Sequence, residues 1–442
     1  MKAIVVGAGT AGLAALHALD RAGVEVSALE RESAAGGRIA GAWRNGYALD
    51  LGAQFFFRES PAAAELARDL GLEGELRGYL FKAANYKRGR FYTGVIDSDP
   101  RVLWRHRRLL MNSQGFTPAG LAQMARFMPA FLKRRRDYDL LAPEKTLDLD
   151  GESAADFALR RGGEEVLEGL VQPVVTNLTL GEPEEVAAGY ALTLLWNILH
   201  GVFTFRRGLG TLASRLADEH RGRLRTGTPA RRIVVEGGRV RGVETDEGFM
   251  DADAVVCATT ATTALELMPD LPASLRGPLE RVRYSACCHV IFALRRRLFP
   301  DGWYGVGFPR REGSFMNLCD NAVKSPYYAP EGCSLIHCFT YGRHSHELLA
   351  LEDGEVLKRV TEEIRRYFPD MTEAPLFAEV RRWREAVCLS PPGMLGAVAG
   401  LRGKVAAEVK GLHLAGEYMY MPSAEAALRS GLDAAGAVLA NG

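Results

Sequence analysis

The chain has 442 residues, of which 47% are hydrophobic and 25% charged, the composition of an ordinary soluble globular protein. This length predicts about two to three domains, and the net charge of +1 excludes a global field that recruits nucleic acid. The seven cysteines are scattered and form no C-x-x-C pair, so we expect free thiols in a reducing, cytoplasmic compartment, without a disulfide framework or a metal site.

The first 30 residues contain a dinucleotide-binding pattern. An apolar run at 3–6, typical of a buried parallel strand, leads into G-x-G-x-x-G, and apolar residues then recur at helical spacing. A second apolar strand at 24–29 ends at Glu30. The three glycines permit a tight turn, close approach of a pyrophosphate and close helix packing, and the acid accepts hydrogen bonds from a ribose. The residues predicted to bind a dinucleotide here are Gly7, Ala8, Gly9, Thr10, Ala11, Gly12 and Glu30.

Three further segments indicate which dinucleotide the chain binds, FAD or NAD. They read ERESAAGGR at 30–38, YALDLGAQFF at 47–56 and GLHLAGEYMYMPSAEAALRSGLDAA at 411–435. In this order they resemble the flavin-dependent superfamily of amine oxidases, protoporphyrinogen oxidases and phytoene desaturases, and most of all its protoporphyrinogen oxidase-type members. The resemblance implies bound FAD. The closing segment has no cysteine, so we expect the FAD to be non-covalent.

The resemblance also implies where each segment meets FAD. The Gly-Gly-Arg turn would follow the pyrophosphate, the segment at 52–55 would pass under the flavin ring, and Glu417 would hold the ribityl chain. Ala230 would lie by the adenine, and the last helix would point its N-terminus at the flavin pyrimidine, where its dipole stabilises negative charge. The additional cofactor-binding residues implied in this way are Arg31, Gly36, Gly37, Arg38, Gly52, Ala53, Gln54, Phe55, Ala230, Trp383, Gly416, Glu417, Ala424 and Ala427.

Beyond residue 57 the sequence predicts a helix and a hairpin. Ser60 and Pro61 are typical of a helix start, with Ser60 as the cap. A strand pair follows at 83–93, with its turn at 88–90.

Residues 101–136 hold nine basic residues and no Asp or Glu. Between the basic clusters, apolar residues from Leu121 to Leu132 suit one helix with an apolar face. Three interpretations remain open: a solvated basic face balanced by acids elsewhere, peripheral contact with an anionic membrane, and attraction of an acidic substrate.

Residues 150–200 have helical patterns, and 186–205 carry no charge over a length that could span a bilayer. The polar residues and glycines within this run favour a buried helix beside the ligand cavity over a membrane span. The next segment resembles the family's return to the nucleotide domain, although Arg207 replaces its usual first glycine, and a hairpin is predicted at 230–245 around two glycines. Residues 266–384 alternate apolar and polar positions, which predicts a mostly antiparallel sheet.

These elements predict an α/β fold. We expect a Rossmann-like FAD-binding domain, with a parallel sheet between helices, built from 1–57, 205–265 and 385–442. An inserted α+β substrate domain, with an antiparallel or mixed sheet plus helices, would comprise 58–204 and 266–384, including the basic helical part at about 101–140.

The predicted function is that of an FAD-dependent oxidoreductase moving hydride from a large apolar or conjugated substrate, porphyrinogen-like or polyene-like, to flavin N5. Amine oxidases of the family have a lysine in the strand facing N5, where this chain offers Cys287, Cys288 and His289, so amine oxidation is less favoured. A redox-neutral flavin-dependent isomerase and a non-catalytic lipid- or prenyl-binding protein of the same fold also stay open. No catalytic residue, electron acceptor or oligomeric state follows from the sequence. We interpret His289 as a hydrogen-bonded core histidine, and leave Tyr418 and Tyr420 between packing and lining the substrate cavity.

Overall fold

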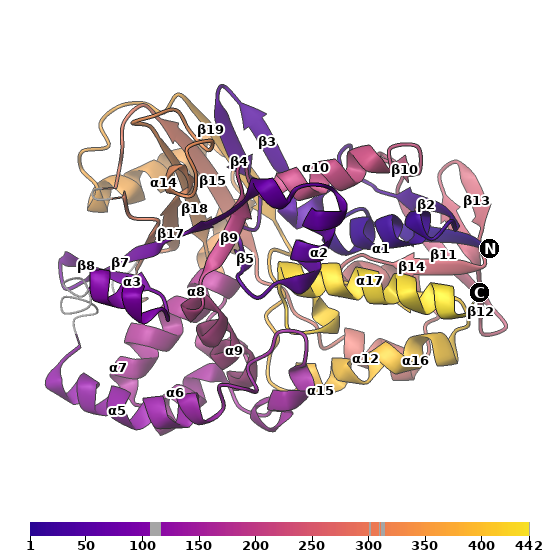
Figure 1. The fold of residues 1–442 in the computed structure, drawn as a ribbon, viewed down its shortest axis with the longest axis horizontal. Helices are drawn as coiled ribbons and strands as arrows, with labels where there is room; N and C mark the ends of the chain where they lie inside the picture. Colours follow the sequence, from indigo (N-terminus) through magenta and orange to yellow (C-terminus); the bar gives the residue numbers. More distant parts are fainter. Residues whose placement is uncertain (107–115, 300–301, 309, 311–313, 442) are drawn as a thin grey trace.

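The parallel sheet joins segments from distant parts of the sequence (Figure 1). We describe it from a computed structural model that places residues 1–106, 116–299, 302–308, 310 and 314–441. The sheet has five parallel strands in the order β10 (Leu224–Arg225), β2 (Glu25–Leu29), β1 (Lys2–Val6), β14 (Ala254–Cys257) and β20 (Leu412–Leu414).

Successive side chains of β1 point to opposite faces of this sheet, and both faces are covered. Ala3 and Val5 pack against helices α1 (Thr10–Arg21) and α17 (Ala424–Asn441). Ile4 and Val6 face the other way, toward the antiparallel sheet β11 (Ala230–Glu236), β12 (Arg239–Thr245) and β13 (Gly248–Asp251). A parallel sheet buried on both faces requires apolar strands, and this explains the run of apolar residues at 3–6.

A second, seven-stranded sheet forms the other half of the molecule. Its strands are β19 (Phe377–Trp383), β15 (Cys287–Leu294), β18 (Ser334–Thr340), β17 (Met316–Asp320), β16 (Gly305–Gly307), β7 (Phe81–Lys87) and β8 (Arg90–Ile96). The neighbouring strands are antiparallel, except for the parallel pair β16 and β7. Helices α13 (Gly342–Leu349) and α14 (Asp353–Tyr367) pack on one face. The predicted combination of a parallel and a mixed sheet is therefore confirmed.

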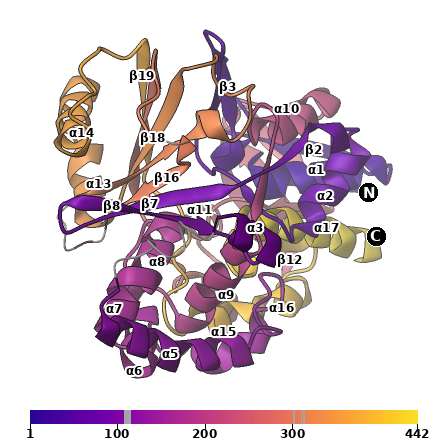
Figure 2. The same cartoon turned by 60° about the vertical axis from the view of Figure 1, so that its left-hand side comes forward.

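Helices from the middle of the chain lie beneath the seven-stranded sheet in Figure 2. They are α5 (Pro118–Lys133), α6 (Ala154–Arg161), α7 (Glu164–Val166), α8 (Gln172–Thr179) and α9 (Ala188–Leu199), with a π-helical turn at Leu167–Val171. All but two of the twelve residues of α9 are buried, which confirms the prediction of a buried helix. In the part of the chain that the structure places, no helix combines the length and apolarity needed to cross a bilayer.

Shorter elements connect these layers. They are β3 (Gly41–Arg44), β4 (Tyr47–Asp50), β5 (Phe56–Phe57), α2 (Pro61–Asp69), β6 (Leu76–Tyr79), α3 (Pro100–Arg105), β9 (Val202–Phe205), α10 (Gly210–Glu219), α11 (Ala261–Leu267), α12 (Ala273–Leu279), α15 (Met394–Ala399) and α16 (Leu401–Glu408). The two-residue loop between β7 and β8 has left-handed backbone angles at both Arg88 and Gly89, as a tight hairpin needs. The cysteines in the described residues are free.

One local prediction was wrong. Ser60 precedes α2, but its hydroxyl makes no capping hydrogen bond. The predicted helix with an apolar face is confirmed by α5, in which Phe127 and Phe131 are buried, although Leu121 is 60% and Leu132 43% exposed.

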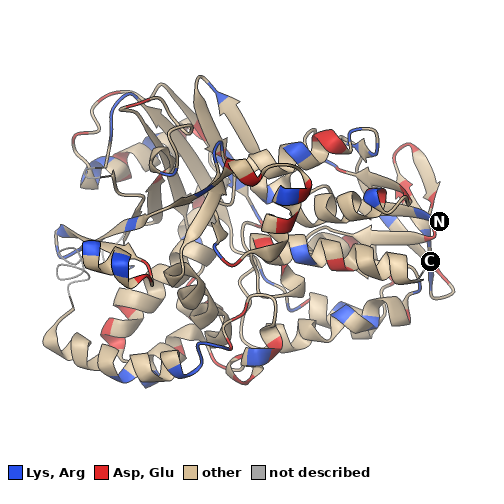
Figure 3. Cartoon of the chain, in the orientation of Figure 1, with Lys and Arg blue, Asp and Glu red and all other residues tan. Residues whose placement is uncertain are grey.

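The basic stretch at 101–136 divides between α3 and α5, and Arg107 and Arg108 fall outside the described residues. Figure 3 shows its basic residues on α3 and α5, with acidic residues on the neighbouring α7. Arg134 pairs with Asp137 and Asp148, so part of the positive charge of this stretch is balanced locally. Contact with a membrane or an acidic substrate stays a prediction.

The aromatic core under α5 gives the first testable expectation. Phe131 is 1% exposed and stacks on Phe127 and Tyr138. We expect Phe131→Ala to lower the free energy of unfolding by about 3–5 kcal/mol, because it removes a ring and leaves a cavity. Leu121→Ala, on the exposed face of the same helix, should change it by less than about 0.5 kcal/mol. Urea denaturation followed by circular dichroism compares the two, and equal losses would contradict this packing.

Candidate functional site

The turn between β1 and α1 owes its shape to glycines. Gly7 has φ of +94°, a left-handed conformation that favours glycine. A Cβ on Gly12 would lie 1.8 Å from the carbonyl oxygen of Gly7, so only glycine lets the helix start this close to the turn. A Cβ on Gly9 would have no atom within 4 Å. The backbone at Gly9 therefore faces open space, where a ligand can approach.

The N-terminus of α1 has no side-chain cap. Thr10, Ala11 and Gly12 are buried, and the first turn carries no acidic residue. The first N–H groups of a helix have no acceptor within the helix, and with the helix dipole they favour an anion. A pyrophosphate would satisfy them, so the residues present fit the phosphate part of a dinucleotide.

Glu30 lies at the end of β2, beside this turn. Its buried carboxylate accepts hydrogen bonds from the N–H groups of Ala8 at 2.8 Å and Glu32 at 2.9 Å. Two of its lone-pair positions are thus used, and the others suit ribose hydroxyls. The Arg31 side chain is 68% exposed and pairs with Glu32, and its contact with FAD stays a prediction.

The Gly-Gly-Arg turn lies against the first glycine turn. The Gly36 N–H donates to the carbonyl of Ala8 at 2.8 Å. A Cβ on Gly37 would come within 3.1 Å of the Cα of Gly9. Both Gly36 and Gly37 have positive φ, which explains why glycines stand at these positions.

Arg38 connects this turn to the last segment of the site. Its guanidinium forms two hydrogen bonds with the carboxylate of Glu417, at 2.5 Å and 2.6 Å. Burial disfavours the charge on Arg38, but Glu417 outweighs it and raises the pKa of Arg38 above its ordinary value. The Tyr284 ring lies 5.9 Å from the guanidinium carbon. Both ionic groups are therefore fixed side by side at the site.

The segment at 51–55 runs along Arg38. The Ala53 N–H donates to the Arg38 carbonyl at 2.8 Å, and a Cβ on Gly52 would lie 2.4 Å from the same oxygen. The Leu51 carbonyl accepts from Trp383 Nε1 at 3.0 Å and also bonds His289 Nδ1 at 3.1 Å. Two strands of the seven-stranded sheet thus hold this loop.

The C-terminal segment completes the arrangement. The Gly416 N–H donates to Ser430 Oγ of α17 at 2.9 Å. Ala424, at the start of α17, packs in the same apolar cluster as Ala53, and Ala427 packs with Ala11. Near the adenine position implied by the family, the N–H of Thr228 donates to the Glu30 carbonyl at 2.8 Å, two residues before Ala230.

The sequence analysis missed a buried polar cluster beside Gln54. No lysine stands in β15, but Lys324, directly after a 3-10 turn at Asn321–Val323, lies buried against Asp50 and Gln54. Burial lowers the pKa of Lys324, and Asp50 opposes this shift. The available signal was Asp50 itself, a charged residue within the apolar segment YALDLGAQFF.

Histidines in β15 and β18 extend this cluster. His289 Nδ1 faces the Leu51 carbonyl and therefore carries the proton, so His289 Nε2 accepts from His337 Nδ1 at 2.9 Å. His337 Nε2 then accepts from the Asn321 amide at 3.1 Å. Burial lowers the pKa of His289 to about 3 and that of His337 well below its ordinary value. The interpretation of His289 as a hydrogen-bonded core histidine is confirmed.

Tyr418 and Tyr420 pack rather than face an open site. Tyr418 is fully buried, and Tyr420 is 8% exposed with its hydroxyl bonded to Asp433. Both belong to the apolar cluster on the β11–β12 side of the parallel sheet.

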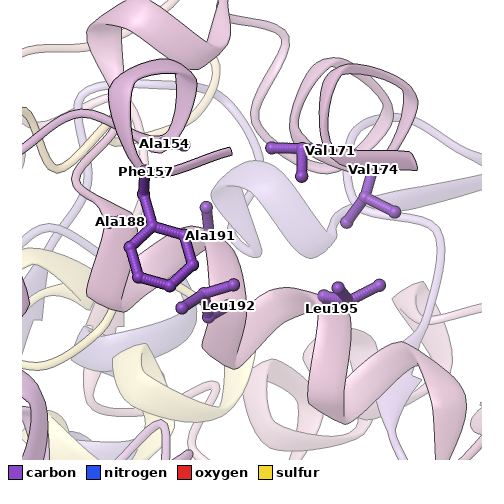
Figure 4. A pocket seen from close by; sticks show the side chains of 8 residues that line it. All are labelled: Ala154, Phe157, Val171, Val174, Ala188, Ala191, Leu192 and Leu195. Carbon is purple, nitrogen blue, oxygen red and sulfur yellow. The ribbon is translucent and has the colours of Figure 1, made fainter. Parts of the chain in front are cut away.

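A small cavity between α6, α8 and α9 lies elsewhere (Figure 4). Its volume is about 10 Å³, the space of roughly one water molecule, and all eight lining residues are apolar. The lining residues are Ala154, Phe157, Val171, Val174, Ala188, Ala191, Leu192 and Leu195. We regard this cavity as a packing defect of the helical layer, too small for a substrate.

Comparison with known proteins identifies the family to which this chain belongs. The pattern of the flavin-containing amine oxidoreductases matches residues 10–439, and the chain belongs to this family. It is 23% identical to coproporphyrinogen III oxidase of Bacillus subtilis, over 93% of this chain and 92% of that one. Chloroplastic protoporphyrinogen oxidase of Nicotiana tabacum is 22% identical, over 95% of this chain and 82% of its own.

Solved structures agree on the fold. Cyclohexylamine oxidase of Brevibacterium oxydans superposes with a TM-score of 0.77 at 20% identity, over 99% of this chain and 98% of that one. The protein is therefore an FAD-dependent oxidoreductase with the fold of the flavin amine oxidases, and it acts on a small-molecule substrate.

Buried neutral histidines predict how stability depends on pH. Burial lowers the pKa of His413, in β20, from 6.5 to about 4. Between these values the unfolded chain binds a proton that the folded protein excludes, so stability falls as the pH drops from about 6.5 to about 4. We expect His413→Gln to remove about 2 to 3 kcal/mol of this dependence.

Urea denaturation across this pH range measures the effect. His346→Gln, at an exposed position of α13, serves as the control and should keep the slope of the parent protein. An unchanged slope in His413→Gln would show that His413 is not excluded from protonation.

Proposed function

We propose that the protein is an FAD-dependent oxidase or dehydrogenase that takes a hydride from a large apolar or conjugated substrate, porphyrinogen-like or polyene-like. When bound, FAD supplies a ring that accepts hydride at N5, while the protein supplies position, polarity and access. The observation that carries this proposal is a group of aromatic rings that begins directly after Gln54.

The aromatic group comes from four separate segments, one of which contributes Tyr304 directly before β16. Phe55 follows Gln54, Tyr79 ends β6 and Phe81 begins β7. The ring of Phe81 lies 5.9 Å from that of Phe55 and 4.9 Å from that of Tyr304, and Tyr79 lies 5.1 Å from Tyr304. Phe55, Tyr79 and Phe81 are each only partly buried. Edge and face contacts of such rings suit a flat, apolar substrate.

The FAD would be held non-covalently across both ends of the sequence. In this proposal the first turn of α1 and the Gly36–Arg38 turn bind the pyrophosphate, and Glu30 binds the adenosine ribose beside Ala230. The loop at 52–55, Trp383, Gly416-Glu417 and the start of α17 surround the rest. The corresponding domain, from 1–57, 205–265 and 385–442, belongs to the same proposal.

Amine oxidation is the second candidate, and the fold of cyclohexylamine oxidase favours it. Against it, β15 has no lysine, and the relatives aligned over nearly the whole chain carry porphyrinogen oxidase names. Since solved structures at this identity share only a fold, we place the conjugated substrate first.

The predicted cofactor contact of Glu30 is tested by FAD affinity. Glu30→Gln removes a charged acceptor, and we expect the Kd for FAD to rise about 10- to 100-fold, the value of a lost hydrogen bond to a charged group. Glu32→Gln makes the same chemical change at a side chain that is 71% exposed and should leave the Kd unchanged. Titration of the apoprotein with FAD, followed by flavin fluorescence, gives both constants. Equal Kd values for Glu30→Gln and the parent protein would show that Glu30 does not bind FAD.

The substrate class is tested by reducing the flavin under anaerobic conditions. The FAD-loaded protein is mixed separately with porphyrinogens, polyenes and amines, and the oxidised flavin absorbance is followed. We expect a porphyrinogen or a polyene to bleach it fastest. Bleaching by amines alone would favour the second candidate, and conversion of a substrate without net bleaching would favour an isomerase.

The role of the aromatic group in substrate binding is tested by a substitution at Phe81, with Tyr86 as the control position. They lie on opposite faces of β7, and Tyr86 packs against Phe91 and Tyr367 away from Phe55. We expect Phe81→Ala to lower kcat/KM about tenfold or more, since burial of such a ring against substrate contributes about 1.5–3 kcal/mol. Tyr86→Ala should leave kcat/KM of the folded protein within about twofold of the parent.

A further inference from the structure

A buried ion pair lies beside the loop at 51–55. Lys324 Nζ is 3.1 Å from Asp50 Oδ2, and both side chains have no exposed surface. Taking two opposite charges out of water is costly, and a pair of this kind persists only where further hydrogen bonds satisfy both groups. The surroundings of each group show that this condition is met.

Lys324 is held in its protonated form by geometry. Its Nζ has three acceptors within hydrogen-bond distance, Asp50 Oδ2 at 3.1 Å, the Gln54 carbonyl at 2.6 Å and Gln54 Oε1 at 3.1 Å. Three acceptors require three N–H donors, which only the ammonium form has. The Tyr304 and Tyr328 rings lie 5.5 Å and 5.2 Å away, in the range of cation–π contacts.

Asp50 is surrounded by donors. Its carboxylate accepts from the Leu209 N–H at 2.8 Å and the Tyr328 hydroxyl at 2.8 Å, in addition to Lys324. A carboxylate with three donors matches the inventory of an ionised group. The pair is thus a fixed positive and a fixed negative charge.

The positive charge controls the orientation of Gln54. Gln54 Oε1 accepts from Lys324 and from the Asn321 amide at 2.8 Å, and Gln54 Nε2 donates to the Gly52 carbonyl at 2.8 Å. The opposite amide orientation would place an NH₂ group against two donors. The carbonyl and the side chain of Gln54 are therefore both fixed by Lys324.

We propose that Lys324 is a positioning residue for the loop at 51–55 and that the Lys324–Asp50 pair sets the reduction potential of the flavin. The inference rests on the proposed function, in which this loop passes under the flavin ring. A hydride brings two electrons and one proton to the ring, so reduction adds one negative charge. A nearby positive charge stabilises that charge, and a nearby negative charge opposes it.

The charges predict potential shifts of opposite sign. Lys324→Met leaves Asp50 alone and should lower the potential, whereas Asp50→Asn leaves Lys324 alone and should raise it. We expect at least a tenfold change in the ratio of affinities for reduced and oxidised flavin in each case, about 30 mV for a two-electron couple. Spectroscopic titration of the FAD-loaded variants against a reference dye measures this.

The matched control is Tyr328→Phe, which removes one hydrogen bond to Asp50 without changing a charge. Its potential should shift by less than half as much as that of either charge variant. Lys324→Gln is a milder variant that keeps a donor for the Gln54 carbonyl and should also lower the potential. The titrations are run at about pH 7 and about pH 9, because an unpaired buried carboxylate can take up a proton at the lower pH.

The outcomes separate this inference from the proposed function. If the parent protein binds no flavin, the proposed function fails. If it binds and reduces flavin normally, but both lysine variants keep its potential at both pH values, the pair does not act on the flavin and the inference is overturned. Loss of FAD binding without a potential shift in the loaded fraction would reduce Lys324 to a purely structural residue.

Discussion

The ion pair between Arg38 and Glu417 joins two parts of the chain that are 379 positions apart. Each group follows a glycine, Gly37 and Gly416, and each comes from a segment anchored on the parallel sheet. Since Glu417 is buried and both of its carboxylate oxygens accept from the guanidinium, loss of either partner would leave an uncompensated charge at the centre of the site. The relative placement of the first and last segments therefore depends on this contact.

The second constraint comes from the seven-stranded sheet. Trp383 of β19 and His289 of β15 both bond the Leu51 carbonyl, and Lys324 holds Gln54 from just beyond the end of β17. The loop at 51–55 thus belongs by sequence to one half of the molecule and by hydrogen bonding to the other. The loop therefore connects the seven-stranded sheet to the parallel half of the molecule.

The sequence was sufficient to predict features that depend on residues close together in the chain. The glycine turn, the acid after β2 and the continuous apolar run of β1 each follow from backbone geometry or from burial of a parallel strand, and the structure has them at the expected positions. The α/β fold followed from the order of family-like segments. The division into domains stays a prediction, because chain segments cross between the two halves at several points.

Features that depend on distant partners were not predictable. Lys324 and Asp50 are 274 positions apart, and no spacing rule links a lysine after one strand to an acid in another. The exposure of Leu121 and Leu132 on α5 depends on how much surface α6 and α7 cover, which helical periodicity does not contain.

The strand order of the parallel sheet also bears on how the protein is made. β1 pairs with β14, and β14 with β20, so the sheet that carries the glycine turn is incomplete until residue 414 has left the ribosome. Pairings between such distant segments form slowly, and the face of β1 that packs against β11 and β12 stays uncovered until those strands are made. During synthesis, this apolar face is therefore a site at which the nascent polypeptide can aggregate.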